Sequence, residues 1–328
     1  MDYTYEEFLN EFVREMENKL ADYDVEISII NRLRNNGILD RTIKVTMPGI
    51  NVTATMSTLA LYEHYKVNDD LNEMVDKLSK NIIINFQKDI NAHSVISKET
   101  ILDSLYLMVV NAKANTVLLS ETPHYLIANG ELAVLPRLNI NIAGRSQAIV
   151  VRNEMLPALQ MTGDEVLQIA KLNTTGQDLF EMDSLLSVTM QLMRENGDDI
   201  AEDFSEFFTE EIPKAFVVTN KDEKWGACCL ACPDVIETIM EKMGMDCYII
   251  PLSVHEVVFV EKKGDFEDLE YLRDVLHEAN LIDAPAEEIL SDKIFQYNSK
   301  TRKIEIANTD QETKELPEAP HKSRGRHM

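Results

Sequence analysis

Two short apolar segments separated by a polar connection, all within residues 247–261, constrain the fold more than any other feature of this sequence. Residues 247–250 and 257–260 are rich in β-branched and aromatic side chains, which predicts two buried strands. The connection between them contains Pro251, Ser253, His255 and Glu256. Polar chemistry therefore interrupts a predicted core at this point, and the connection is the first candidate site.

The polar connection allows two interpretations. Alternate residues of an extended strand share a face, so Ser253 and His255 would lie together, with the serine as a nucleophile activated by the imidazole. Adjacent residues face opposite ways, so His255 and Glu256 do not form a natural acid/base pair, and no G-x-S-x-G motif surrounds the serine. The alternative is that hydroxyl and imidazole satisfy backbone groups where the strands cross. Pro251, His255 and Glu256 are also candidate binding residues.

The four cysteines are Cys228, Cys229, Cys232 and Cys247. Their number suggests a zinc site, and Cys229-Leu-Ala-Cys232-Pro is similar to a redox motif. Residues 227–231 are predicted to form a strand, however, in which neighbouring thiols face opposite ways. In a reducing compartment such cysteines are usually small buried side chains. We therefore expect no cofactor and no metal, and Cys229 and Cys232 are the candidate ligands should a metal bind.

The charge balance limits the partners of this chain. It has 57 Asp and Glu against 32 Lys and Arg, for a formal net charge of -25. Binding to nucleic acid or to anionic lipid depends on Lys and Arg that neutralise phosphate, so both are disfavoured. The N-terminus lacks a basic region followed by an apolar run, and no window approaches the roughly 18 consecutive apolar residues of a membrane span. We expect a cytoplasmic protein that contacts no membrane.

Acidic residues are concentrated between residues 178 and 213. This segment is predicted to be a linker or an exposed helix, because runs of like charge favour solvent. The candidate binding residues within it are Asp198, Asp199, Glu202 and Asp203. A docking surface for a basic partner is the functional alternative. Another is a mimic of nucleic acid that binds a DNA-binding protein.

The first 95 residues carry the patterns of a self-contained α+β unit. Residues 4–22 have apolar side chains four apart, as in an amphipathic helix. Alternating apolar residues predict strands at 25–29 and 43–47, joined by a loop of Asn35, Asn36 and Gly37 that tolerates positive φ. A third strand is expected at 50–55, followed by helices that begin at Ser57 and after residue 70.

The rest of the chain is predicted as mixed sheet segments with flanking helices, which makes the whole protein α+β. After the N-terminal unit of residues 1–95 come a middle mixed α/β segment at 96–177, the acidic segment at 178–213, a C-terminal α+β unit at 214–307 and a disordered tail at 308–328. The expected strands include 105–110, 132–135, 148–151, 215–218 and a final hairpin of 293–297 with 303–306. A turn is expected at 144–146, and helices near residues 162, 233 and 268.

Several motifs are similar to those of one bacterial family. They are V-V-T-N at residues 217–220, G-A-C-C-L at 226–230, Y-I-I-P-L-S-V-H-E-V at 248–257, E-E-I-L-S-D at 287–292, E-T-P-H at 121–124 and A-K-L-N-T at 170–174. The chain resembles domain of unknown function 5688, which occurs mainly in Firmicutes. The resemblance implies a recurring bacterial architecture and brings no assigned activity. Asn220 and His124 lie in these motifs and are further candidate binding residues.

The leading functional hypothesis is a non-enzymatic binding or regulatory module. Its expected partner is a protein of unknown identity, for which a basic surface is one option, docked near His255 or on the acidic segment. A hydrolase-like enzyme that uses Ser253 and His255 is the first alternative, and it would need a third polar partner beside them. The acidic nucleic-acid mimic is the second alternative.

Overall fold

The structure, a computed structural model, describes residues 3–48, 53–68, 70–91, 98–142, 145–176, 180–195, 214–221, 224–244, 246–262, 266–282 and 284–307. The chain forms two compact units. Unit 1 comprises Met1–Leu107, Ala114–His124 and Leu135–Asn173, and unit 2 comprises Met108–Lys113, Tyr125–Val134 and Thr174–Met328. Antiparallel sheets with flanking helices confirm the predicted α+β class. The five-part organisation expected from the sequence stays a prediction.

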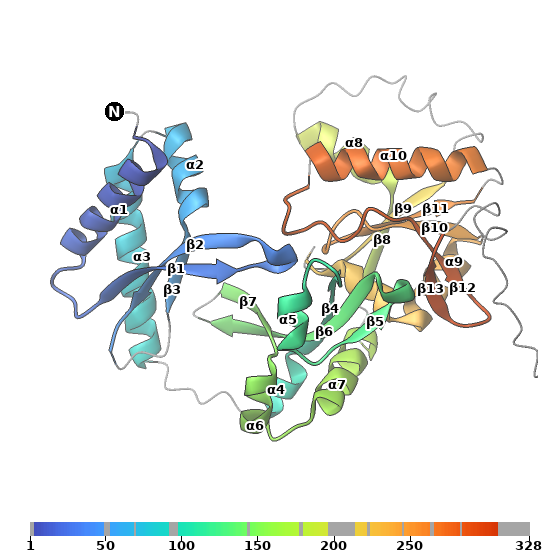
Figure 1. Cartoon of the computed structure of the whole chain (residues 1–328), viewed down its shortest axis with the longest axis horizontal. Helices are drawn as coiled ribbons and strands as arrows, with labels where there is room; N and C mark the ends of the chain where they lie inside the picture. Colours follow the sequence, from blue (N-terminus) through green and yellow to red (C-terminus); the bar gives the residue numbers. More distant parts are fainter. Residues whose placement is uncertain are drawn as a thin grey trace, which may run out of the picture. The chain divides into compact units, whose positions relative to one another are not determined.

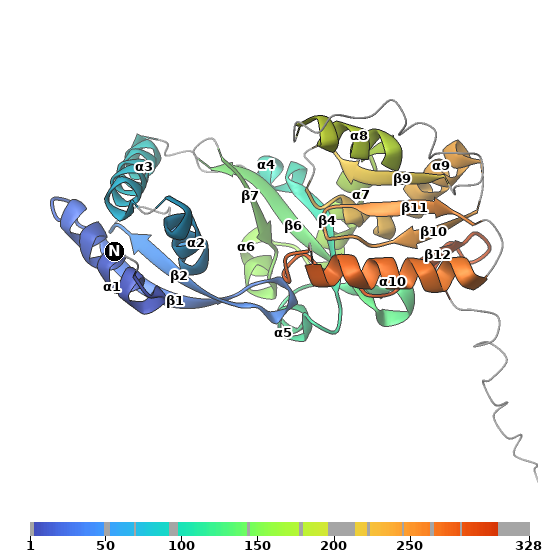
Figure 2. The ribbon, with the colours of Figure 1, turned by 90° about the horizontal axis from the view of Figure 1, so that it is seen from above.

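The N-terminal part of unit 1 is a three-stranded meander packed against helices (Figures 1 and 2). Its elements are α1 (Tyr5–Lys19), β1 (Glu26–Leu33), β2 (Leu39–Thr46), β3 (Ala54–Ser57), α2 (Thr58–Asn68) and α3 (Leu71–Asn91). The strands pair antiparallel in the order β1-β2-β3. The predicted order of helix, meander and helices is confirmed. Of the third strand predicted at 50–55, residues 50–52 lie outside the described residues.

Local sequence signals explain where α1 begins and which face it buries. Thr4 and Glu7 form a capping box, in which the Thr4 N–H donates to the Glu7 carboxylate at 2.9 Å. The buried face carries Phe8, Phe12 and Met16, which share one core with Ile43 and Val45 of β2. Val25 and Ile27 pack against the same core, whereas the side chains of β1 from Ile29 onward are exposed.

The loop between β1 and β2 forms as its residue types predict. Asn36 has φ 58° and Gly37 has φ 70°, which are conformations that Asn and Gly tolerate. The Arg34 N–H donates to the Ile38 carbonyl at 2.8 Å and closes the hairpin. The predicted loop is therefore confirmed.

The middle of the chain contributes a four-stranded sheet of order β4-β6-β5, with β7 also paired to β6. Its elements, with the neighbouring helices, are α4 (Lys98–Asp103), β4 (Leu105–Asn111), α5 (Thr116–Ser120), β5 (Tyr125–Ile127), β6 (Leu132–Ile142), β7 (Arg145–Val150), α6 (Leu156–Leu159) and α7 (Gly163–Gly176). The turn predicted at 144–146 is wrong in extent. Arg145 and Ser146 already belong to β7 and pair with Ile142 and Asn141.

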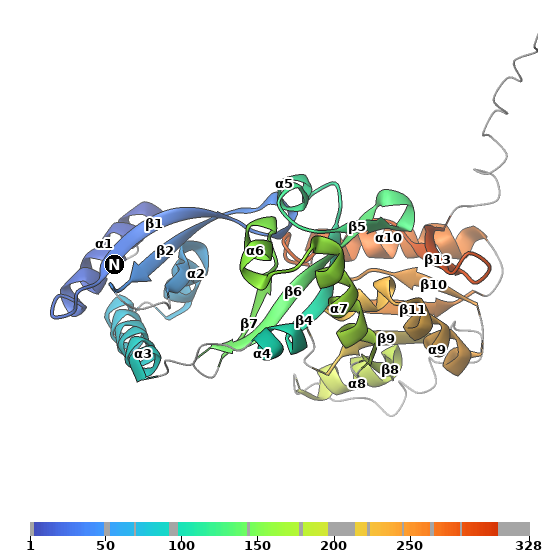
Figure 3. The same ribbon diagram turned by 90° about the horizontal axis from the view of Figure 1, so that it is seen from below.

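Unit 2 is organised around a six-stranded sheet of order β13-β12-β10-β11-β9-β8 (Figures 1 and 3). Its strands are β8 (Phe180–Ser184), β9 (Ala215–Asn220), β10 (Cys247–Ile250), β11 (Val257–Glu261), β12 (Phe295–Asn298) and β13 (Lys303–Ile306). The helices are α8 (Leu185–Glu195), α9 (Pro233–Met243) and α10 (Phe266–Ile282). Every neighbouring pair of strands is antiparallel. The two buried strands predicted on either side of the polar connection are thus β10 and β11, at the centre of this sheet.

The strand predicted at residues 227–231 is wrong, because Gly226–Ala231 forms a 3-10 helix. Trp225 has φ 65° and turns the chain away from an extended path. Hydrogen bonds between residues three apart follow, from the Cys228 N–H to the Trp225 carbonyl and from the Cys232 N–H to the Cys229 carbonyl. The whole segment is buried, so its apolar side chains show no periodicity that separates a helical turn from a strand.

The segment predicted as an acidic linker or exposed helix begins with two regular elements. β8 pairs antiparallel with β9 at the edge of the sheet, and α8 follows it directly. Residues 196–213, with Asp198, Asp199, Glu202 and Asp203, lie outside the described residues, as does the tail predicted to be disordered at 308–328. Within the described part of the chain, none of the helices combines the length and the apolar composition needed to cross a membrane.

Candidate functional site

The predicted polar connection is a compact loop between β10 and β11. The last residue pair of the two strands is Ile250 with Val258. The Ser253 N–H donates to the Glu256 carbonyl at 3.1 Å, and the Ser253 Oγ accepts the His255 N–H at 3.0 Å. Ser253 and His255 therefore lie in a turn rather than on one face of a strand, and the hydroxyl satisfies a backbone group of its own loop.

Both ring nitrogens of His255 face groups of other segments. Nδ1 accepts the backbone N–H of Trp225 at 3.1 Å. A backbone N–H only donates, so Nδ1 carries no proton and the neutral ring holds its proton on Nε2. Nε2 lies 3.5 Å from Oε1 of Glu288, with the two side chains 26% and 35% exposed. The imidazole is thus fixed in one tautomer, at a surface that solvent reaches.

Glu288 is held in place by its own backbone. Its carbonyl accepts the Val254 N–H at 2.9 Å, and its N–H donates to the Pro285 carbonyl at 2.7 Å. The first bond joins the segment around Glu288 to the loop that carries His255. The backbone of Glu288 is therefore fixed beside the loop that carries His255.

Trp225 approaches the same imidazole with its ring. The ring centroids of Trp225 and His255 are 5.3 Å apart and the planes are tilted by 60°. Trp225 has a left-handed backbone conformation, with φ 65° and ψ 22°, which is uncommon for a bulky residue. Together with Glu288 these residues form what we call the Trp225 cluster: Trp225, His255 and Glu288.

Gly226 allows the backbone of the cluster to close. Its N–H donates to the His255 carbonyl at 2.8 Å, and the same carbonyl accepts the Thr219 hydroxyl at 3.0 Å. A Cβ on Gly226 would lie 2.5 Å from the His255 carbonyl oxygen and 2.6 Å from the Thr219 Cα. Only glycine fits this approach.

Asn220, a sequence candidate, supports the turn that leads to the cluster. Its buried side chain accepts the Lys224 N–H at 3.0 Å and donates to the Lys224 carbonyl. This pair of bonds sets the direction in which the chain enters Trp225. Asn220 therefore fixes the backbone that leads into the Trp225 cluster.

The remaining sequence candidates are Pro251, Glu256 and His124, and the structure shows where each of them lies. Pro251 is buried and Glu256 is partly exposed in the loop itself. His124 belongs to unit 1, where its Nδ1 lies 2.9 Å from the Thr122 carbonyl oxygen, so it is not one of the residues of the Trp225 cluster.

The four cysteines are buried free thiols in unit 2. Cys228, Cys229 and Cys232 belong to or adjoin the 3-10 helix, not the predicted strand. Burial raises the pKa of Cys229 well above its ordinary value and that of Cys247 to about 11. A protonated thiol is a poor nucleophile and a poor metal ligand, so this environment suits packing. Within the described residues, groups of three or more potential metal ligands are absent.

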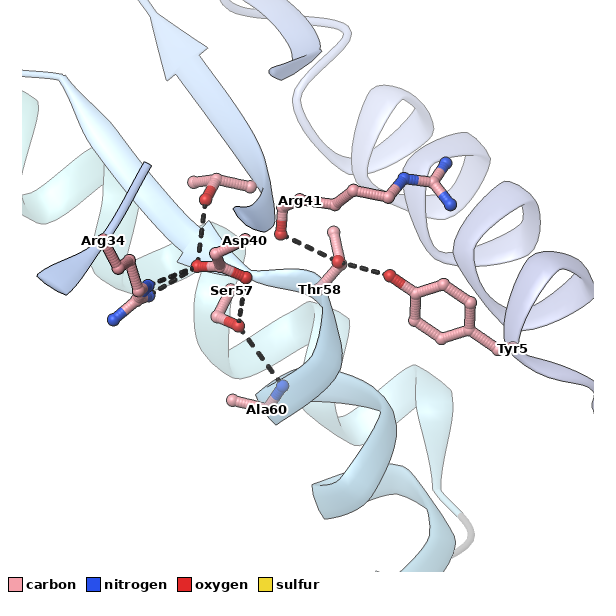
Figure 4. Close-up of polar contacts among 8 residues, drawn as sticks. Tyr5, Arg34, Asp40, Arg41, Ser57, Thr58 and Ala60 are labelled. Carbon is pink, nitrogen blue, oxygen red and sulfur yellow. Dashed lines mark hydrogen bonds and ion pairs between the residues drawn. The ribbon is translucent and has the colours of Figure 1, made fainter. Parts of the chain in front are cut away.

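A second polar cluster, in unit 1, was not anticipated from the sequence (Figure 4). Asp40 is 8% exposed and accepts Nε of Arg34 at 2.7 Å and the Ser57 hydroxyl at 2.9 Å. The Thr58 hydroxyl donates to the Arg41 carbonyl at 2.8 Å and lies 2.6 Å from the Tyr5 hydroxyl. These bonds join the meander to α1 and α2, so the cluster has a structural role. A signal was present, since an Asp and an Arg flank the hairpin loop.

Unit 2 also has an open cavity of about 480 Å³ that contains none of the predicted site residues. Its lining includes apolar side chains of β8, β9 and α9 and the charged residues Glu181, Asp234 and Lys242. Since none of the predicted site residues lines this cavity, we place the candidate site at the Trp225 cluster.

Sequence reasoning missed Trp225, Gly226 and Glu288. Trp225 is the one tryptophan of the chain and precedes a glycine and a run of small residues, which is a signal for a close backbone approach. Glu288 had no such signal, because its proximity to His255 comes from the fold alone.

The sheet and the Trp225 cluster define an antiparallel α+β protein with a preformed polar cluster at a strand connection. The chain belongs to the family of unknown function DUF5688, whose model matches residues 5–299. The resemblance seen in the sequence motifs is thereby confirmed. No curated protein and no solved structure matches the chain.

Proposed function

We propose that this protein is a non-enzymatic binding module of the bacterial cytoplasm, whose protein partner docks on the Trp225 cluster. The observation that supports this proposal most directly is the left-handed backbone of Trp225 beside His255. Such a conformation costs on the order of 1–3 kcal/mol for a residue other than glycine, and it persists where surrounding contacts enforce it. Residues held in this way are concentrated at binding sites and active sites.

The residue types of the cluster suit a protein partner with a basic surface. Tryptophan is enriched among the residues that dominate binding energy at interfaces. The Glu288 carboxylate suits a Lys or Arg side chain through an ion pair, and the Trp225 ring suits one through a cation–π contact. The net charge of -25 would also speed the approach of a basic partner.

The geometry favours binding over the hydrolase alternative. A serine nucleophile needs a base within hydrogen-bond reach of its hydroxyl. Here the Ser253 Oγ accepts the His255 backbone N–H, and the ring nitrogens of His255 face Trp225 and Glu288. Catalysis would require this turn to rearrange, whereas docking uses it as it stands.

An affinity pull-down tests the proposal. The full chain, its His255→Ala variant and a deletion of residues 195–211 serve as baits in lysate of a bacterium that carries the protein. His277→Ala is the matched control, since His277 is exposed on α10. We expect a basic protein that binds wild type and His277→Ala and is lost with His255→Ala.

The same experiment separates the alternatives. A partner lost only on deletion would move the interface to the acidic segment, and equal recovery with every bait would contradict docking at the cluster. The purified partner is then titrated into wild type, with the emission of the single tryptophan as the readout. Covalent labelling of Ser253 by a fluorophosphonate probe would instead support the hydrolase.

A further inference from the structure

The strand β1 presents an open edge. It is the outer strand of the order β1-β2-β3 within the described residues, and Figure 3 shows it along the outside of the sheet. Its pairing with β2 is regular from Glu26 with Thr46 to Leu33 with Leu39, without a bulge. The strand also contains no Pro or Lys, and its charged residues are Glu26 and Arg32. Proline, bulges and Lys protect the edges of natural sheets, so an edge without these three devices is a template for strand addition.

The hairpin closure shows which backbone groups face outward. The Arg34 N–H donates to the Ile38 carbonyl, so even-numbered residues of β1 point their backbone groups toward β2. The odd-numbered residues Ile27, Ile29, Asn31 and Leu33 therefore direct their N–H and C=O groups away from the sheet. A strand added here would find a regular ladder of donors and acceptors.

Large apolar side chains are exposed along the same edge. Ile29 is 41%, Ile30 37% and Leu33 42% exposed. Burying such side chains removes apolar surface from water, which favours association. The edge thus combines unpaired backbone groups with apolar surface.

We infer that β1 pairs antiparallel with β1 of a second copy of this chain, with the two-fold axis at Ile29. In this register Ile29 faces its own equivalent, Ile27 faces Asn31, and Glu26 faces Arg32 of the other copy. In this register the odd-numbered residues of one copy face odd-numbered residues of the other. The N–H and C=O groups that point outward from each strand can therefore hydrogen-bond to one another. Shifting the axis to Ile30 would place Glu26 opposite Arg34, which already binds Asp40.

Charge complementarity selects the second copy as the occupant. Glu26 and Arg32 are both exposed and lie equally far from Ile29 on either side. Antiparallel symmetry converts this arrangement into two ion pairs across the interface, each between opposite charges directly facing one another. The resulting sheet would run β3-β2-β1-β1-β2-β3, with the helices of both copies on the same face.

A charge-swap experiment on the full chain tests the register. Sedimentation velocity over a concentration series gives the dimer dissociation constant of wild type, Glu26→Arg, Arg32→Glu and the double swap. Each single change turns both symmetric pairs repulsive, so we expect that constant to rise about tenfold. The double swap restores opposite charges and should restore dimerisation. Glu63→Arg, an exposed acid on α2, is the matched control and should leave the dimer unchanged.

A backbone variant tests the ladder independently. Asn31→Pro removes an outward N–H that the β1–β2 pairing does not use, and proline is tolerated at such edge positions. We expect a monomer with an unchanged circular dichroism spectrum. A monomeric wild type, a dimer indifferent to both single charge changes, or a double swap that fails to restore dimerisation would each overturn the proposal. The last two outcomes would mean that the dimer forms through a strand or register other than β1 paired at Ile29.

Discussion

The backbone N–H of Trp225 donates a hydrogen bond of 3.1 Å to Nδ1 of His255. This single bond fixes the tautomer of the imidazole and joins the entry to the 3-10 helix to the loop between β10 and β11. It also makes Trp225, the one tryptophan in the chain, a reporter on the contact with His255.

Replacing His255 should change the tryptophan emission of the protein. His255→Ala removes the acceptor of the Trp225 N–H and the ring whose centroid lies 5.3 Å from that of the indole. We expect a shifted emission maximum for His255→Ala and an unchanged spectrum for His277→Ala, because His277 is exposed on α10. Identical spectra for wild type and His255→Ala would contradict the contact between Trp225 and His255.

Substituting Gly226 should destabilise unit 2. The Cβ of Gly226→Ala would lie 2.5, 2.6 and 2.9 Å from backbone atoms of His255, Thr219 and Asn220. Backbone cannot move aside as a flexible side chain does, so we expect a loss of about 3 kcal/mol, at the upper end for overpacking. Chemical denaturation measures it. Gly176→Ala, whose Cβ meets nothing within 4 Å, is the control and should leave the free energy of unfolding nearly unchanged.

The buried hydrogen bonds of Asp40 to Arg34, Ser57 and Thr42 should contribute more to stability than an exposed ion pair does. Asp40→Ala removes the acceptor of Arg34, Ser57 and Thr42 in a buried position, so we expect a loss of about 2 kcal/mol. Glu6→Ala breaks the exposed pair between Glu6 and Arg41 and should cost less than about 1 kcal/mol. Thermal denaturation of both variants checks the difference, and equal effects would contradict the structural role of Asp40.

Alkaline pH should weaken unit 2 through Tyr125. Burial raises the pKa of Tyr125 from 10.0 to about 12, so the folded protein holds this proton over a pH range in which the unfolded chain releases it. The free energy of unfolding therefore falls as pH rises from about 10 to about 12. The loss is at most about 2 kcal/mol because the side chain is partly exposed.

Tyr125→Phe tests this sign directly. Urea denaturation at a series of alkaline pH values should give a flatter stability profile for the variant than for wild type. Parallel profiles would mean that Tyr125 ionises equally easily in the folded and unfolded chains.

The native thiols should be unreactive. All four cysteines are buried, and burial raises the pKa of Cys229. We expect a chromogenic disulfide reagent to label them only after unfolding, whereas the exposed position of Glu63→Cys gives immediate labelling in the folded chain. Rapid labelling of native wild type, or a rise in melting temperature on addition of zinc, would contradict a packing role.

Much of the fold could be predicted because its signals are local. The four-residue spacing of Phe8, Phe12 and Met16 marks α1, and Pro233 and Gly244 mark the two ends of α9. The segments on either side of the polar connection read as strands because they are short and β-branched. The segment at 227–231 was misread because complete burial removes the periodicity that distinguishes a 3-10 turn from a strand.

The candidate site was only half predictable. Composition and alternation along the chain predict that polar residues, His255 among them, interrupt a buried sheet, because both signals depend on neighbouring residues alone. That the His255 ring faces Trp225 and Glu288 rather than the Ser253 hydroxyl follows from the folded chain alone. These partners are distant in sequence, and their approach depends on strand pairing and on a glycine without a side chain at position 226. Long-range pairing leaves no local pattern, so only the folded chain reveals it.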